Sequence, residues 1–281
     1  MHCESTRVES RYGGNGGAGG ASQILDDRGV TGLNYHNHSR LVLALMWTAS
    51  LVLLPILLWQ GHRTRQMALR LPEAESPDSG HFGTGESEIS IVGLGDSVIA
   101  GIGIKVLSDS VTARVADSLA QELSTAISWR ASGINGERLA NLLFRLKKEP
   151  LPQADIYLVS IGVNDVTGLT PLVRWQMQVI ELITLLDRRG RIVLLGVPPM
   201  QYFTALPQPL RQVLGIRAAL LDKTLREVAD TVERVVWLDA SVDFDHRHLA
   251  QDGYHPNEVA CVEMAAKIVD ALMLRRGLLK P

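Results

Sequence analysis

Residues able to do covalent chemistry lie at two distant places in this chain. Ser97 ends the tripeptide Gly95-Asp96-Ser97, and Asp252 precedes His255 by three positions. A serine hydroxyl is a weak nucleophile that needs a base within hydrogen-bond distance. An aspartate at that spacing can accept the imidazole Nδ1–H, fix its tautomer and stabilise the imidazolium formed when Ser97 loses its proton. Taken alone, each motif is equally typical of a helix cap, so the chemistry depends on the two being brought together.

Two further loops offer hydrogen-bond donors for a developing oxyanion. The amide of Asn164 lies in the Gly-Val-Asn-Asp stretch at 162–165, and Gly136 can present a backbone N–H. The backbone N–H at Ser97 is a third donor. Removing one such donor typically costs about 3–4 kcal/mol of transition-state stabilisation. The alternatives are an Asx-turn at Asn164 and a simple tight turn at Gly136.

A sheet of parallel strands would bring these loops together. From about Ile89 onward, short apolar runs alternate with segments of helical periodicity, which predicts a parallel sheet covered by helices on both faces. The run Ile156–Ile161 is almost continuously apolar, as a strand buried on both faces should be. The predicted strands are Ile89–Leu94, Ala126–Ala131, Ile156–Ile161, Arg191–Val197 and Val235–Leu238. The predicted helices are Ser110–Leu123, Glu137–Lys148, Pro171–Arg188, Pro209–Val232 and Val259–Leu274.

The polar motifs follow the first three of these strands. Residues 95–97 follow the first strand, residues 133–137 the second and residues 162–165 the third. Ligands of open α/β sheets bind outside the carboxyl ends of the strands, near the point where the strand order reverses. We therefore expect three loops to converge on one site at that edge of the sheet.

Four short motifs in this order resemble the SGNH (GDSL-type) hydrolase family of esterases and lipases. The family's blocks are Gly-Asp-Ser near the start of the domain, a glycine after the second strand, Gly-x-Asn-Asp after the third, and Asp-x-x-His near the end. They match Gly95-Asp96-Ser97, Gly136, Gly162-Val163-Asn164-Asp165 and Asp252-Gly253-Tyr254-His255, and the resemblance covers roughly residues 89–281. Many relatives carry Asp or Ala and then Thr after the second-block glycine, whereas this chain has Glu137-Arg138. Gly133 is a second candidate for that glycine.

The resemblance implies a flavodoxin-like three-layer α/β/α sandwich with a five-stranded parallel sheet. It makes Ser97 the nucleophile, His255 the general acid/base and Asp252 the residue that orients the histidine. The N–H groups of Ser97 and Gly136 and the amide of Asn164 would form the oxyanion hole. The Gly-x-Ser-x-Gly elbow of α/β-hydrolases does not occur around Ser97, which argues against that fold.

These roles predict hydrolysis of small-molecule or lipid acyl esters through an acyl-serine intermediate, with no metal or organic cofactor. Thioesters, lysophospholipids and O-acetylated carbohydrates remain open as substrates, and a non-catalytic binding module of the same fold is the alternative from another class. The acids and histidines from Asp243 to His255 match no metal-ligand spacing. Trp175 and the loop Pro198–Phe203 are apolar candidates for an acyl pocket.

The first 88 residues predict attachment to a membrane. Residues 1–40 are rich in Gly, Asn, Ser and charge, and we expect a disordered arm. Residues 41–61 carry no formal charge, and their 21 positions reach roughly 30 Å as a helix, the thickness of a bilayer core. We expect a transmembrane helix or signal anchor there, a linker over residues 62–88 and the hydrolase domain over residues 89–281. A cleaved signal peptide is disfavoured because Gln-Gly-His-Arg at 60–63, rather than small residues, follows the apolar run.

The distribution of charge bears on sidedness and partners. Arg63, Arg65 and Arg70 flank one end of the apolar segment, and Arg28 and Arg40 flank the other. The positive-inside rule then favours the cytoplasmic face for the catalytic domain of a single-pass protein. The formal net charge of −2, with no basic run interleaved with aromatic residues, gives no sign of nucleic-acid binding. The two cysteines imply no disulfide framework.

Overall fold

The computed structural model divides the chain into two units, residues 1–34 and residues 35–281. It describes residues 24–25, 31–32, 35, 37–84, 87–149, 153–187, 190–239 and 247–274. Most of the expected disordered arm, residues 1–40, lies outside the described residues. In the first unit, β1 (Ile24–Leu25) pairs antiparallel with β2 (Thr31–Gly32). All that follows concerns the second unit.

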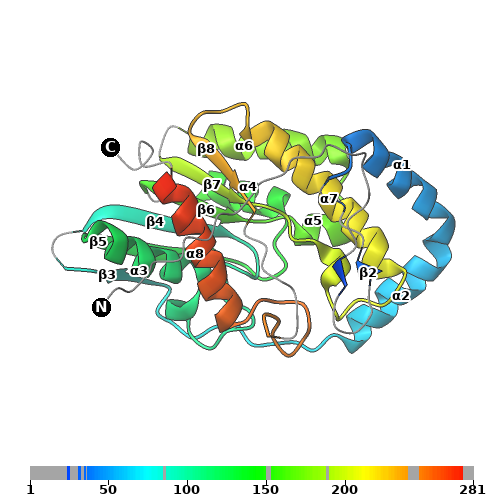
Figure 1. The fold of residues 1–281 in the computed structure, drawn as a ribbon, viewed down its shortest axis with the longest axis horizontal. Coiled ribbons are helices and arrows are strands. Elements are labelled where there is room, and N and C mark those ends of the chain that lie inside the picture. Colours follow the sequence, from blue (N-terminus) through cyan, green and yellow to red (C-terminus); the bar gives the residue numbers. More distant parts are fainter. Residues whose placement is uncertain are drawn as a thin grey trace, which may run out of the picture. The chain divides into compact units, whose positions relative to one another are not determined.

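One sheet forms the centre of the second unit, with the strand order β3-β5-β4-β6-β7-β8 (Figure 1). Five of its strands are mutually parallel, and β3 pairs antiparallel with β5 at one edge. In their own chain order the parallel strands run second, first, third, fourth, fifth, which is the flavodoxin-like order. The strands are β3 (Ser79–Phe82), β4 (Ser87–Gly95), β5 (Ala126–Gly133), β6 (Ile156–Ser160), β7 (Arg191–Leu195) and β8 (Val235–Leu238).

The prediction of a five-stranded parallel sheet is wrong by one strand. The sheet has six strands and is mixed, because β3 adds to its edge within the range expected to be a linker. The sequence of β3, Ser-Gly-His-Phe, shows no apolar alternation. A Cβ atom at Gly80 would lie 3.0 Å from Nε1 of Trp129 on β5, so the glycine lets the indole lie against the strand. Pairing with β5 rather than local propensity makes this segment a strand.

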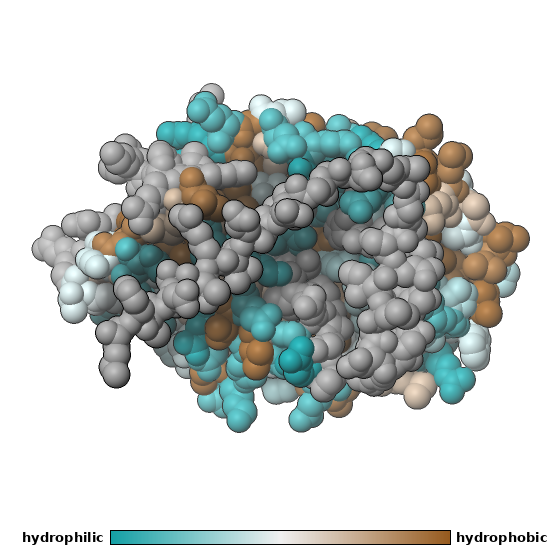
Figure 2. Space-filling view, viewed as in Figure 1, coloured by the Kyte–Doolittle hydropathy of each residue, from teal (hydrophilic) through white to brown (hydrophobic). Residues whose placement is uncertain are grey.

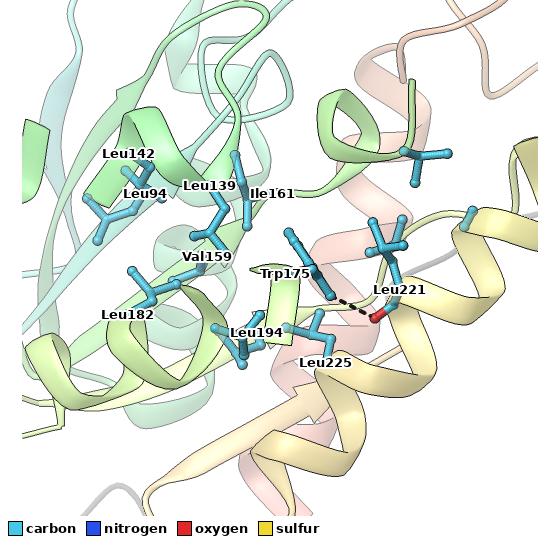
Figure 3. Packing of buried hydrophobic residues seen from close by; sticks show 14 of the residues in the cluster. Leu94, Leu139, Leu142, Val159, Ile161, Trp175, Leu182, Leu194, Leu221 and Leu225 are labelled. Atoms are coloured by element: carbon cyan, nitrogen blue, oxygen red, sulfur yellow. Dashed lines mark hydrogen bonds between the residues drawn. The ribbon is translucent and has the colours of Figure 1, made fainter. Parts of the chain in front are cut away.

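Helices cover both faces of the sheet and give three layers. Ile91 and Leu158 face one apolar cluster with α3 (Val111–Leu123) and α8 (Glu258–Leu274). Leu94 and Val159 face the other cluster, where α4, α6 and α7 pack. Figure 3 shows this second cluster around Trp175, whose indole Nε1 donates to the carbonyl of Leu221 over 3.0 Å. The helices of that layer are α4 (Leu139–Lys148), α6 (Leu172–Leu186) and α7 (Leu210–Ala229).

A long apolar segment, Arg40–Met67, lies against α7 at the side of the domain (Figure 1). It consists of α1 (Arg40–Ser50), the 3-10 turn η1 (Leu51–Leu53) and α2 (Leu54–Met67), and we call it the apolar helix. Its mean hydropathy reaches 2.5 over 18 residues, so by length and composition it can cross a membrane. The apolar helix lies near the N-terminus, where a signal sequence would show the same length and hydropathy.

Candidate active site

The turn that carries Ser97 is fixed between β4 and β6. Gly95 ends β4 with φ +149°, and a Cβ atom there would collide with the carbonyl oxygen of Ser160. That same oxygen accepts the backbone N–H of Asp96 over 3.1 Å. The Ser97 carbonyl in turn accepts the N–H of Ile102 over 2.9 Å. Ser97 is therefore held at the carboxyl edge of the sheet, at the point where the strand order reverses.

Asp252 and His255 form a hydrogen-bonded pair in the turn before α8. Oδ2 of Asp252 lies 2.6 Å from Nδ1 of His255, and Oδ1 accepts the backbone N–H groups of Tyr254 and His255, each over 3.0 Å. Burial acts to raise the pKa of the Asp252 carboxyl, but the hydrogen bonds and the charge of the imidazole outweigh it, so the pKa is lowered. Asp252 is thus an ionised acceptor that leaves Nε2 of His255 facing away from the pair.

Ser97 and His255 line the same pocket, which has a volume of about 60 Å³. Its walls are mainly apolar and include Leu195, Phe203 and Met264. The Ser97 hydroxyl makes no hydrogen bond to His255 or to another described residue. A larger open depression of about 570 Å³ lies on the sheet beside β3 and β5, away from the strands' carboxyl ends.

The two candidate glycines of the second loop have different surroundings. Gly136 has φ +79°, and a Cβ atom added to it would have no neighbour within 4 Å. Gly133, by contrast, packs so closely on the turn after β4 that a Cβ atom would collide with the N–H of Ala100. Within the described part of the chain, neither the Gly136 N–H nor the Ser97 N–H has a hydrogen-bond partner. No described residue therefore occupies either donor, and both N–H groups can bind a ligand atom.

Asn164 joins the three loops. It lies in the short helix α5 (Val163–Thr167), and its Nδ2 donates to Oδ2 of Asp96 over 3.3 Å and to the carbonyl of Glu137 over 3.2 Å. Both bonds are long for N–H···O contacts. The amide therefore lies between the Ser97 turn and the second loop, with both its hydrogens engaged. Next to it, the buried Asp165 carboxylate accepts the N–H of Leu139 over 3.0 Å and so fixes the start of α4.

Glu137 and Arg145 form a buried ion pair that sequence reasoning did not find. The guanidinium of Arg145 binds both carboxylate oxygens of Glu137, at 3.1 and 2.8 Å, and also the hydroxyl and carbonyl of Ser132. The side chains of Glu137 and Arg145 are only 3% and 16% exposed. The pair therefore fixes the loop that carries Gly136 and the carbonyl that holds Asn164. Glu137, where this chain departs from the family pattern, therefore supports the second loop through its bond to Arg145. In the sequence, Arg145 is one of three basic residues in the last turn of α4, where a positive charge interacts favourably with the helix dipole.

Replacing Arg145 by methionine is expected to lower the free energy of unfolding by about 3–5 kcal/mol, because the Glu137 carboxylate would be left buried without a partner. Below the unfolding transition we also expect a lower kcat, since Gly136 and Asn164 lose their support. Urea denaturation and steady-state kinetics measure the two effects. The double variant Glu137→Gln with Arg145→Met should recover part of the stability. A single variant within about 0.5 kcal/mol of wild type would show that the pair does not hold the loop.

Asp96 is fully buried behind Ser97, and burial raises the pKa of its carboxyl to about 7 despite a hydrogen bond from the Val98 N–H. The charges of Asp165 and Glu137 raise it further. In the unfolded chain the group ionises near pH 4. Between those values the folded protein retains a proton that the unfolded chain has released. The stabilisation is therefore complete below about pH 4 and is lost as the pH rises through about 7.

This gives a pH-dependent prediction. From pH 5 to pH 8, the free energy of unfolding of the wild type should fall by about 2–3 kcal/mol more than that of an Asp96→Asn variant, which cannot ionise. Chemical denaturation at the two pH values measures the difference. Parallel losses in the two proteins would show that Asp96 is ionised in the folded state at neutral pH.

Other predicted residues lie in different surroundings. Phe203 lines the pocket, whereas Trp175 is fully buried in the core. In the cluster of acids and histidines before α8, residues 243–246 lie outside the described residues, and Nε2 of His248 lies 3.0 Å from a carboxylate oxygen of Glu263. Among the described residues there is no group of three or more potential metal ligands. The ring centre of Tyr254 lies 4.8 Å from that of Phe203. The fourth motif, which contains Tyr254, is the only signal for this residue in the sequence.

Several solved structures share this fold. The psychrotrophic esterase EstA from Pseudoalteromonas sp., inhibited by monoethylphosphonate, is 17% identical with a TM-score of 0.52, over 68% of this chain and 100% of that chain. A lipolytic protein of the G-D-S-L family from Veillonella parvula is 13% identical with a TM-score of 0.52, over 66% of this chain and 98% of that one. A catalytic mutant of Axe2, an acetylxylan esterase from Geobacillus stearothermophilus, is 16% identical with a TM-score of 0.50, over 66% and 94%.

Among curated proteins, the chain has no match. The model of the GDSL-like lipase/acylhydrolase family matches residues 94–260, which is more than half of the chain. The match includes all four motifs and the elements from the end of β4 to the start of α8. The chain therefore belongs to the GDSL-like lipase/acylhydrolase family, the SGNH hydrolases.

Proposed function

We propose that this protein is a serine esterase that hydrolyses carboxylic acyl esters through an acyl-Ser97 intermediate. The observation that carries the proposal is that Ser97 lines one pocket with His255, whose Nδ1 is bonded to Asp252. Membership of the GDSL-like lipase/acylhydrolase family and a fold shared with esterases support ester hydrolysis in general. The roles of the individual residues rest on the geometry of this chain.

The reaction begins when Nε2 of His255 takes the proton of the Ser97 hydroxyl, and Oγ attacks the acyl carbon. Asp252 stabilises the imidazolium that forms. His255 then protonates the leaving alcohol, and the acyl group stays on Ser97. Water, deprotonated by His255, attacks the acyl carbon; the bond from that carbon to Ser97 Oγ then breaks, His255 returns the proton to Oγ, and the acid leaves. No step requires a metal or an organic cofactor.

The oxyanion of each tetrahedral intermediate is proposed to bind the N–H groups of Ser97 and Gly136 and the amide of Asn164. The two backbone donors have no partner among the described residues, which supports their role. Asn164 must exchange one of its long bonds, to Asp96 or to the Glu137 carbonyl, for the oxyanion. Because a hydrogen bond to a charged oxygen is stronger than a neutral one, this exchange favours the transition state.

The size of the pocket points to a short acyl group. Its volume of about 60 Å³ is far below the roughly 300–1,000 Å³ typical of pockets for drug-sized ligands. An acetyl or similar group fits such a space better than a long chain. The pocket volume limits the acyl group but does not select the leaving alcohol or thiol. Carbohydrate O-acetyl esters, lysophospholipids and thioesters are therefore alternative substrates.

Activity on p-nitrophenyl esters tests the acyl preference. We expect kcat/KM to fall by about tenfold or more from acetate to octanoate. Replacing Phe203 by alanine should move the optimum toward longer chains, because the ring forms part of the pocket wall. Tyr202→Ala, one residue away and not among the pocket residues, is the matched control. An octanoate optimum in the wild type would mean that acyl chains bind elsewhere.

We also propose that the protein is associated with a membrane through its N-terminal region. The proposed organisation keeps residues 41–61 as the membrane segment, residues 62–88 as the connection and residues 89–281 as the catalytic domain. The length and hydropathy of the apolar helix support the membrane segment. For a segment that crosses the bilayer, the distribution of arginines would favour the cytoplasmic face for the domain.

A further inference from the structure

The apolar helix presents large hydrophobic side chains outward as well as toward the protein. Its buried residues are Leu43, Ser50, Leu57 and Gln60, two of which are polar. From Leu41 to Trp59 most of the exposed residues are large and hydrophobic, and Val52 is 82% exposed. A helix that packs on a domain in water carries charged and polar residues on its outer side instead. The exposed hydrophobic residues are Leu41, Val42, Leu45, Leu51, Val52, Leu53, Leu54, Ile56, Leu58 and Trp59, and we call them the outer face. Figure 2 shows hydrophobic colour concentrated along this edge of the molecule.

Specific polar contacts hold the inner side of the apolar helix on the domain. The side-chain amide of Gln60 is 7% exposed; its Nε2 donates to the carbonyl of Gln208 over 2.6 Å, and its Oε1 accepts the N–H of Leu210 over 3.1 Å. Both polar atoms of this buried side chain are thus satisfied by the start of α7. Polar side chains of helices in lipid likewise face protein partners rather than the hydrocarbon.

Contacts at the other end fix the direction of the apolar helix along α7. Arg40 pairs with Glu227 over 3.1 Å, and the guanidinium of Arg217 lies 4.8 Å from the centre of the Trp47 ring. With the Gln60 contacts, these bonds tie the apolar helix to α7 near its start, middle and end. A crossing of the bilayer by this segment would break them, because α7 belongs to the folded domain. The contacts therefore favour an orientation along the membrane surface.

The charges beside the outer face complement an anionic surface. No acidic residue occurs from Leu41 to Pro72, whereas Arg63, Arg65 and Arg70 lie in this stretch and are exposed. The guanidinium of Arg63 lies 5.5 Å from the ring centre of Trp59, so a cation adjoins an exposed indole. Basic residues next to an apolar helical face, with tryptophan at the boundary, are typical of segments that lie in the plane of an anionic membrane.

We infer that the apolar helix is an in-plane membrane-docking element: it stays bound to α7 and places its outer face in the interfacial layer of a bilayer that contains anionic lipids. This orientation differs from the single-pass crossing that its length predicts. Near its end the apolar helix is bonded through Gln60 to Gln208 and Leu210, in the segment that follows the pocket residue Phe203. The docked domain would therefore have its pocket near the lipid surface. The inference does not depend on the chemistry proposed for Ser97.

Vesicle flotation of the full chain tests the docking surface. We expect binding to phosphatidylcholine vesicles that contain about one-third phosphatidylglycerol, and weaker binding to phosphatidylcholine alone. Substituting Val52 and Leu58 by glutamine should reduce binding at least about tenfold. The control is Val262→Gln on α8, which is also exposed but lies on the opposite layer; it should bind as the wild type does. Equal binding by all variants, or none by the wild type, would overturn the inference.

Accessibility of the two ends distinguishes docking from crossing. Cysteines are introduced singly at Asn37 and Met67 in a Cys3→Ser background; the remaining Cys261 is buried. Protein added to sealed vesicles is then treated with a membrane-impermeant maleimide. In-plane docking predicts that both cysteines react before detergent is added. A crossing helix predicts that the Asn37→Cys variant reacts only after detergent, and that result would contradict the inference. Because neither readout uses turnover, an inactive enzyme would still report on docking.

Discussion

The Ser97→Ala variant should lose turnover of p-nitrophenyl acetate by about 10⁴- to 10⁶-fold relative to wild type. The reason is that the covalent route requires a nucleophile within reach of His255, and alanine offers none. The oxyanion donors and the pocket would remain, so some acceleration over the reaction in water should persist. Steady-state kinetics with the purified full chain measures the loss.

Two controls make this result specific. Ser118→Ala, on α3 and outside the pocket, removes a hydroxyl from another site and should leave kcat within about twofold of wild type. The unfolding midpoint of the Ser97→Ala variant should match that of the wild type, because the Ser97 hydroxyl has no hydrogen-bond partner among the described residues. Full turnover by a correctly folded Ser97→Ala protein would exclude Ser97 as the nucleophile.

Asp252→Asn is the variant with the second-largest expected effect, a fall in kcat of about 10⁴-fold. An asparagine at this place would present an N–H or a weaker acceptor to Nδ1 of His255, so the imidazole would be held less well in the tautomer that accepts from Ser97. Loss of the carboxylate also removes the charge that stabilises the imidazolium. The KM should change little, because Asp252 does not line the pocket.

The charge of Asp252 also affects stability at low pH. Its pKa is lowered in the folded protein, so the stabilisation is present above the unfolded value, near 4, and is lost as the pH falls through the lower folded value. Denaturation of the Asp252→Asn variant should accordingly show a smaller loss below pH 4 than that of the wild type. Asp230→Asn, at the exposed end of α7, is the matched control and should keep both activity and the acid response. An active Asp252→Asn enzyme would remove the aspartate from the mechanism.

The sequence was sufficient to predict what local patterns and motif order determine. The parallel strands β6, β7 and β8 are nearly continuous apolar runs, and the loops after the first three parallel strands carry Ser97, Gly136 and Asn164. Because parallel strands place their carboxyl ends at one edge, the convergence of these loops could be expected before the structure was known. The pairing of Asp252 with His255 follows from their separation by three residues in a turn.

Features that depend on contacts between distant segments could not be predicted. Strand β3 exists because it pairs with β5 and accommodates Trp129, and its own sequence carries no strand pattern. The bidentate bond between Arg145 and Glu137 connects a helix to a loop, and no periodicity marks it. The side of the apolar helix that faces α7 could not be predicted either, because residues 41–61 carry no charge that would mark a polar face. The contacts of Arg40, Trp47 and Gln60 reveal it.

The central claim is that Ser97 is an activated nucleophile, and the most direct measurement is peptide mapping by mass spectrometry after reaction with a fluorophosphonate. The proposed mechanism predicts one adduct, on the peptide that contains Ser97, and no adduct in the Ser97→Ala variant. A folded wild-type protein that remains unlabelled, or that carries the adduct on another residue, would contradict it.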